Sequence, residues 1–177
     1  MIYLCEREMG FDAAAVGFPS VEGCRAVVVV TAGGLFGFHL NGTLSAAKRA
    51  AFVAFVTQHV HGVVIRRIYA ASAGVGQEMA HAQQELRVLA GDLNYAGSIY
   101  WATLPPGGSS YVDYLDINHT SCVITARPWS EANDAVAGNR GPYVGGANRA
   151  MANGAPPSTM YTGVDQAGLV ARYPVAI

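Results

Sequence analysis

Charge is scarce in this sequence. Only 13% of the 177 residues are charged, the formal net charge is −1, and no run of basic residues occurs. Such a chain lacks the basic patch of a DNA- or RNA-binding protein, so no nucleic-acid partner is expected. The hydrophobic content of 51% also excludes an intrinsically disordered chain, because disordered chains have too few apolar residues for a core. We expect a single domain spanning residues 1–177.

Lysine is almost missing, since Lys48 is the only one among the eleven basic residues. GC-rich bacterial coding explains this bias and the many Ala, Gly and Val residues. Selection against lysine in a protein that meets host ubiquitin ligases is the alternative explanation.

The sequence has no long hydrophobic run. The longest, residues 50–56, falls well short of the roughly 20 residues that span a bilayer. The N-terminal residues also lack the basic and apolar segments of a secretory signal peptide. We therefore expect no transmembrane segment. The expected location is the cytoplasm, or a target cell that the protein enters by a route independent of a signal peptide.

Cysteines are few, and their spacing is uninformative for disulfides or metals. Cys5, Cys24 and Cys122 make an odd number and form no Cys-x-x-Cys motif. A disulfide framework and a structural zinc site are both disfavoured. The sequence predicts neither a metal site nor a cofactor.

Hydrophobic periodicity and turn residues predict a chain of mixed secondary structure. A β-branched run at 24–31 indicates a strand buried on both faces, and Gly33-Gly34 predicts a tight hairpin to the next strand. The expected helices are 45–60 and 77–89, and the expected strands are 1–5, 24–31, 35–40, 62–70, 97–104, 110–117, 121–127 and 168–173. Residues 10–20 are expected to be an irregular lead-in. The fold class is α+β, an α/β sandwich with a mixed, largely antiparallel sheet of about six to eight strands and two main helices.

Residues 130–159 differ from the rest of the chain. They are rich in Gly, Ala, Asn and Pro and show little periodicity. We expect a long loop or a segment that wraps around the domain.

The hairpin places two chemically useful side chains together. Cys24 begins the first strand and His39 lies near the end of the second, so strand pairing brings a thiol and an imidazole to the same end of the sheet. A cysteine nucleophile requires such a base nearby. Gly23 lets the backbone approach a substrate, and amides near it can face an oxyanion.

This part of the chain resembles the core of the cysteine glutamine deamidases. The resemblance lies in Val21-Glu22-Gly23-Cys24, followed by a strand, a glycine-rich turn and a second strand that carries His39. This group includes the catalytic domain of cytotoxic necrotizing factor, the Burkholderia lethal factor and the chemoreceptor deamidase CheD. The resemblance covers about residues 20–60. It implies a bacterial hydrolase of the kind used as an effector toxin, and a protein substrate that carries a reactive glutamine.

The resemblance also implies roles for individual residues. Cys24 is the nucleophile and His39 its base, acting through a thioester intermediate without a cofactor. Some members orient the histidine with a threonine six positions before the cysteine, where this chain has Phe18, and others use a backbone carbonyl. Ser20 is the side-chain candidate for that orienting role, and Gly23 the candidate for the oxyanion site.

Two other functions remain open. One is a non-catalytic binding or immunity-type protein on the same fold, and the other is a different Cys–His amidase or peptidase. A second constellation, Glu78, His81 and Glu85, aligns on one face of the expected helix 77–89. Only one such motif is present, whereas a carboxylate di-iron bundle needs two, so we expect a solvated helix face.

Overall fold

The structure is a computed structural model that describes residues 1–177 except 60–63, 107, 120 and 132–137. The helices are α1 (Ala46–His59) and α2 (Gly76–Asp92). The strands in this part of the chain are β1 (Ile2–Tyr3), β2 (Glu8–Asp12), β3 (Ala15–Val21), β4 (Cys24–Thr31), β5 (Gly34–Asn41), β6 (Ile65–Ser72), β7 (Ile99–Thr103), β8 (Ser110–Ile117), β9 (Ser121–Pro128), β10 (Arg140–Pro142), β11 (Arg149–Met151), β12 (Thr159–Tyr161), β13 (Val170–Arg172) and β14 (Val175–Ala176).

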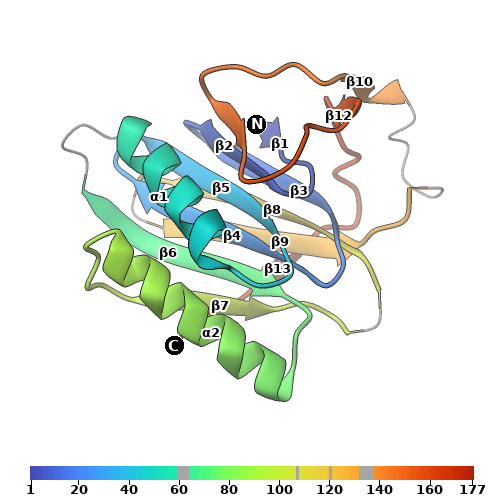
Figure 1. The fold of residues 1–177 in the computed structure, drawn as a ribbon. Coiled ribbons are helices and arrows are strands. Elements are labelled where there is room, and N and C mark those ends of the chain that lie inside the picture. The colour runs from blue at the N-terminus through green and yellow to red at the C-terminus, as the bar shows by residue number, and fades with distance from the viewer. Residues whose placement is uncertain (60–63, 107, 120, 132–137) are drawn as a thin grey trace.

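The strands form two stacked sheets, and the helices cover one of them (Figure 1). The larger sheet has seven strands in the order β11-β2-β5-β4-β6-β7-β14, and the smaller has five in the order β1-β3-β8-β9-β13. Strands β10 and β12 pair separately. Most pairings are antiparallel, and β6–β7 and β1–β3 are parallel. The predicted α+β class and largely antiparallel pairing are confirmed.

Strand β4 occupies the middle of the molecule, and all eight of its residues are buried. Its side chains alternate between two cores. Val27 and Val29 pack against the helices, whereas Ala26, Val28 and Val30 pack against the smaller sheet. The layers are therefore helices, seven-stranded sheet and five-stranded sheet, with a hydrophobic core on each side of β4.

The β4–β5 hairpin forms as the sequence predicts. Thr31 pairs with Gly34 at the turn, and Cys24 pairs with Asn41 at the open end. Gly34 has φ of +138°, a conformation that other residues rarely adopt, and a Cβ there would lie 2.6 Å from the Asp12 carbonyl oxygen. The hairpin thus needs glycine both for its backbone angle and for the close passage of β2.

The expectation of an irregular lead-in at 10–20 is wrong, because this region contains most of β2 and β3. The glycines that suggest irregularity are sites of close approach between layers. A Cβ on Gly10 would lie 2.5 Å from Leu4 Cδ2, and one on Gly17 would lie 2.7 Å from Tyr3 Cδ1. These strands use glycine to pass near neighbouring side chains.

The segment 130–159 crosses the surface and adds strands of its own, while residues 132–137 lie outside the described part. Strand β11 extends the larger sheet by pairing with β2. An ion pair of 2.6 Å between Arg149 Nη1 and Glu8 Oε1 accompanies this contact, and the other Glu8 oxygen accepts a hydrogen bond from the Cys5 amide. The Glu8 side chain is fully buried. This pair holds the late segment against the start of the chain.

We expect Arg149→Met to lower the free energy of unfolding by about 3 kcal/mol, because it leaves the Glu8 carboxylate buried and uncompensated. Urea denaturation measures the loss. The matched control is Arg49→Met, since Arg49 pairs with Asp92, whose side chain is 41% exposed. That change should cost about 1 kcal/mol or less. Equal losses in the two variants would contradict the structural role of the Glu8–Arg149 pair.

Candidate functional site

Cys24 and His39 lie on the same face of the larger sheet. Cys24 pairs with Asn41 and Ala26 pairs with His39, so the thiol and the imidazole are diagonal neighbours on the face that meets the smaller sheet. Diagonal neighbours of an antiparallel pair are about 7–8 Å apart at the backbone, which long side chains can bridge. Cys24 is 5% exposed and His39 is 1% exposed. The sheet register therefore places the two sequence-predicted residues on one face as diagonal neighbours, and in the described residues no hydrogen bond joins the Cys24 thiol to His39 Nε2.

The His39 ring is fixed by a backbone carbonyl. His39 Nδ1 lies 2.9 Å from the Leu4 carbonyl oxygen. Because a carbonyl oxygen only accepts, Nδ1 carries the hydrogen, and in the neutral ring Nε2 is then an unprotonated acceptor. Nε2 is buried and has no hydrogen-bond partner among the residues that the structure describes. The His39 ring is thus oriented by one nitrogen, and its other nitrogen is an unpaired acceptor.

The Leu4 carbonyl is itself held firmly in place. The Leu4 amide donates to the Gly17 carbonyl at 2.9 Å, and the Arg7 amide donates to the His39 carbonyl at 2.8 Å. The segment between β1 and β2 is therefore bonded to both sheets beside the imidazole. Phe18, from β3, packs its ring edge-on against the His39 ring at a centroid distance of 5.9 Å. Backbone bonds and aromatic packing together set the orientation of His39.

The thiol is protonated at neutral pH. Burial raises the pKa of Cys24 to about 11, and the carboxylates of Glu6 and Glu22 act in the same direction. A hydrogen bond from the Glu22 backbone and the ammonium group of Lys48 oppose this rise. Burial lowers the pKa of His39 to about 4, against the effect of its bond to Leu4. The resting pair is therefore a neutral thiol and a neutral imidazole.

The other two sequence candidates, Ser20 and Gly23, form no hydrogen bond to the His39 ring among the described residues. Ser20 is exposed, and its hydroxyl lies 3.2 Å from the Ser109 hydroxyl, so the histidine is oriented by Leu4 instead. Gly23 has φ of +61°, and no atom lies within 4 Å of the position that a Cβ would occupy. The space beside the backbone immediately before Cys24 is therefore open.

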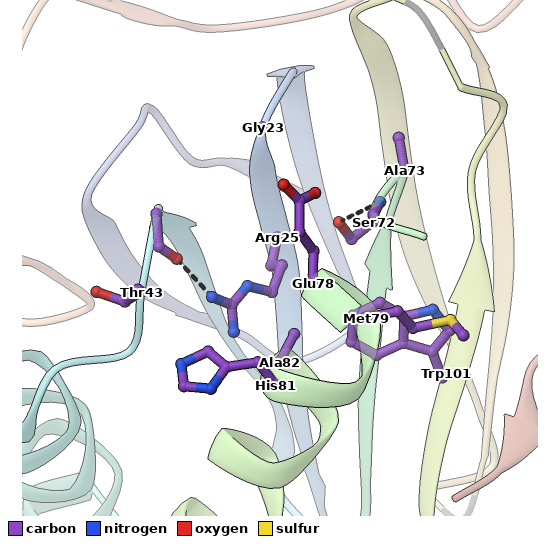
Figure 2. Close-up of a pocket in the computed structure, with 12 residues that line it drawn as sticks. Gly23, Arg25, Thr43, Ser72, Ala73, Glu78, Met79, His81, Ala82 and Trp101 are labelled. Carbon is purple, nitrogen blue, oxygen red and sulfur yellow. Dashed lines mark hydrogen bonds between the residues drawn. The ribbon is translucent and has the colours of Figure 1, made fainter. Parts of the chain in front are cut away.

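A pocket of about 460 Å³ opens on the opposite, helix-covered face of the same sheet (Figure 2). It begins at Gly23 and Gly42, next to the Cys24 end of the hairpin, and extends to the first turns of α2. Arg25 lies along it, 2.5 Å from Glu85 Oε2, and donates to the Gly42 carbonyl at 2.6 Å. The expectation of a solvated helix face is wrong for Glu85, because its side chain is only 13% exposed and also accepts from the Leu44 amide.

Sequence reasoning missed the Leu4 carbonyl, the proximity of Glu6 to the thiol, and the pocket at α2. A backbone carbonyl carries no sequence signal, since every residue has one. The pocket draws its lining from β4, β6, β7 and α2, so it becomes visible only after these elements are placed.

In the described ranges, no cluster of three or more His, Cys, Asp or Glu side chains is arranged to hold a metal ion. None of the helices in those ranges has the length and apolar character needed to cross a membrane. Comparison with known proteins finds no matching family model and no matching curated protein.

The buried His39 predicts a loss of stability in acid. The unfolded chain takes up a proton on this residue below pH 6.5, whereas the folded protein resists doing so until about pH 4. The free energy of unfolding should therefore fall between these pH values by about 3 kcal/mol. Urea denaturation of wild type and His39→Phe at several pH values measures the difference, and His81→Gln, at an exposed position, is the control. A wild-type profile that matches that of His39→Phe would contradict the burial of a neutral imidazole.

The raised thiol pKa predicts slow alkylation at neutral pH. The rate of Cys24 modification by iodoacetamide should rise about tenfold per pH unit from pH 7 to 10, because the thiolate is the reactive form. Peptide mass spectrometry separates Cys24 from Cys5, whose pKa is also raised to about 11, and from Cys122, whose pKa is raised to about 12. Rapid labelling of Cys24 that is independent of pH below 8 would show a preformed thiolate and contradict this description.

Proposed function

We propose that the protein is a glutamine deamidase that uses Cys24 and His39. The observation that carries the proposal is the hydrogen bond from His39 Nδ1 to the Leu4 carbonyl, which leaves Nε2 as an unpaired base on the face that holds Cys24. The cysteine deamidases that this sequence resembles include members in which a backbone carbonyl orients the histidine. Leu4 supplies that third group where neither Phe18 nor Ser20 provides one.

The reaction begins from the neutral pair. As Cys24 Sγ attacks the carbonyl carbon of the glutamine side chain, its proton passes to His39 Nε2. This transfer requires Cys24 Sγ and His39 Nε2 to approach to roughly 3 Å. In enzymes without bound substrate the separation of such a pair is often longer. Backbone amides near Gly23 and Cys24 stabilise the oxyanion that forms.

The tetrahedral intermediate then collapses. The imidazolium returns its proton to the amide nitrogen, the C–N bond breaks, and ammonia leaves. Nε2 next takes a proton from water, whose oxygen attacks the thioester carbon, and the C–S bond breaks to regenerate the thiol. One water is consumed, and one glutamate and one ammonia are formed. No stable thiolate is needed before the attack. The buried imidazole, held by its bond to a carbonyl, receives the thiol proton while the sulfur attacks.

The open space at Gly23, next to the buried thiol, favours a protein substrate. Cys24 is the first residue of β4, and the open space at Gly23 lies at the end of the hairpin. A glutamine presented on a surface loop can reach this position, whereas the interior between the sheets is filled by side chains. Use as a bacterial effector inside a target cell is the biological setting that we propose for this activity.

The test is incubation of the protein with a cell extract and mass spectrometry of the glutamine-containing peptides. We expect peptides that gain about 1 Da with wild type and not with Cys24→Ala, because an amide nitrogen is exchanged for oxygen through the thioester. In H₂¹⁸O the gain should rise to about 3 Da, since water supplies the new oxygen.

Cys122→Ala is the matched control, because Cys122 is also a free cysteine and lies on β9 of the smaller sheet. It should retain the activity, and His39→Gln should lose it. Modification that persists in Cys24→Ala would contradict the proposal. No modification with wild type would favour a non-catalytic binding protein, and cleaved peptides would assign the pair to a peptidase.

A further inference from the structure

The pocket beside α2 contains hydrogen-bonding groups that the fold itself does not use. Trp101 of β7 lines it, is 2% exposed, and has a buried indole Nε1 without a partner in the described part of the chain. A buried tryptophan N–H normally finds an acceptor, because an unpaired donor in the interior destabilises the protein. Trp101 lines the pocket while its Nε1 is covered, so a ligand acceptor reaches this unpaired donor once a covering side chain moves.

A second donor lies next to the indole. Ala70 pairs with Trp101 and Ser72 pairs with Thr103, so Ser72 and Trp101 are neighbours on the helix-facing side of β6 and β7. Ser72 Oγ accepts a hydrogen bond from the Gly74 amide at 3.2 Å, and its own hydroxyl hydrogen remains available. Both donors are buried, and both line the pocket. Each of the two groups can donate a hydrogen bond to a ligand.

The pocket has no excess of positive charge, because Arg25 and His81 both pair with Glu85 and Glu78 adds a further carboxylate. The Arg25 guanidinium is already engaged by Glu85 and the Gly42 carbonyl, so its charge is compensated. Figure 2 shows the Glu78 side chain extending from the first turn of α2 toward the mouth of the pocket, between Gly23 and Ser72. Its carboxylate repels a ligand carboxylate and accepts from an N–H group.

We propose that this pocket binds a neutral primary carboxamide. The amide oxygen accepts from Trp101 Nε1 and the Ser72 hydroxyl, and the amide nitrogen donates to the Glu78 carboxylate. Met79 and Ala82 provide the apolar contact for the attached carbon chain. Because the indole nitrogen is covered, a lining side chain moves when the ligand enters. Met79 is unbranched and flexible, and it is the group best suited to this movement.

This site is distinct from the Cys24–His39 pair. Arg25 and the pocket face the helices, whereas Cys24 faces the smaller sheet. The proposal of carboxamide binding is therefore independent of the proposal that Cys24 is a catalytic nucleophile. The ligand is either a free small amide or the Asn or Gln side chain of a bound polypeptide, since both present the same group.

The experiment follows the two indole N–H signals in ¹H–¹⁵N spectra of the whole chain during titration. Propionamide should shift the Trp101 signal and leave that of Trp129 unchanged, with Trp129→Phe used for assignment. Propionate, which has the same shape and a negative charge, should bind more weakly. A capped Gly-Gln-Gly peptide that binds more tightly than propionamide would identify a polypeptide as the source of the amide.

Variants test the individual contacts. Ser72→Ala should weaken propionamide binding about two- to tenfold, the usual effect of losing one hydrogen bond. Glu78→Gln should reduce the preference for propionamide over propionate. Glu131→Gln, at an exposed position outside the pocket, should change neither the affinity for propionamide nor this preference. Absence of a Trp101 shift at about 100 mM propionamide would overturn the proposal, since small ligands reach only weak affinity. Propionate binding as tightly as propionamide would also overturn it.

Discussion

The hydrogen bond between His39 Nδ1 and the Leu4 carbonyl is the interaction on which the proposed activity depends. It selects one tautomer of a buried imidazole and directs the free electron pair to the other nitrogen. The bond is protected from water because His39 is buried between the two sheets. Since the acceptor belongs to the backbone, the arrangement depends on the path of residues between β1 and β2 and not on a particular side chain at position 4.

That path depends on the stacking of the two sheets. Strand β1 joins the smaller sheet and β2 joins the larger one, so the intervening turn spans both layers beside His39. Close contact between the layers requires small residues. A Cβ on Gly37 of β5 would lie 2.6 Å from Val16 Cγ1 and 2.7 Å from Leu4 Cδ1. The buried Glu8–Arg149 pair then ties a distant segment to the same region, which links overall stability to the geometry of the candidate site.

The sequence allowed part of this arrangement to be predicted. The β-branched run at 24–31 and Gly33-Gly34 predicted the hairpin and placed Cys24 and His39 at the same end of the sheet, and the observed register adds that they share a face. Strands β2 and β3 were missed because Gly10 and Gly17, which suggest irregular structure, serve close packing between layers. The Leu4 carbonyl and the Trp101 pocket depend on contacts between elements far apart in sequence, so no local pattern indicates them.

The central claim is that His39 is held as a neutral base with its Nε2 available to Cys24. Burial of the ring and of the thiol gives this pair a resting state without charges, and in the proposed mechanism the proton moves only during attack on the substrate. The ¹⁵N chemical shifts of the imidazole test this claim most directly. The account predicts a protonated Nδ1 and an unprotonated Nε2 from pH 8 down to about pH 5. A protonated Nε2 with a bare Nδ1, or a fully charged ring in this range, would contradict it.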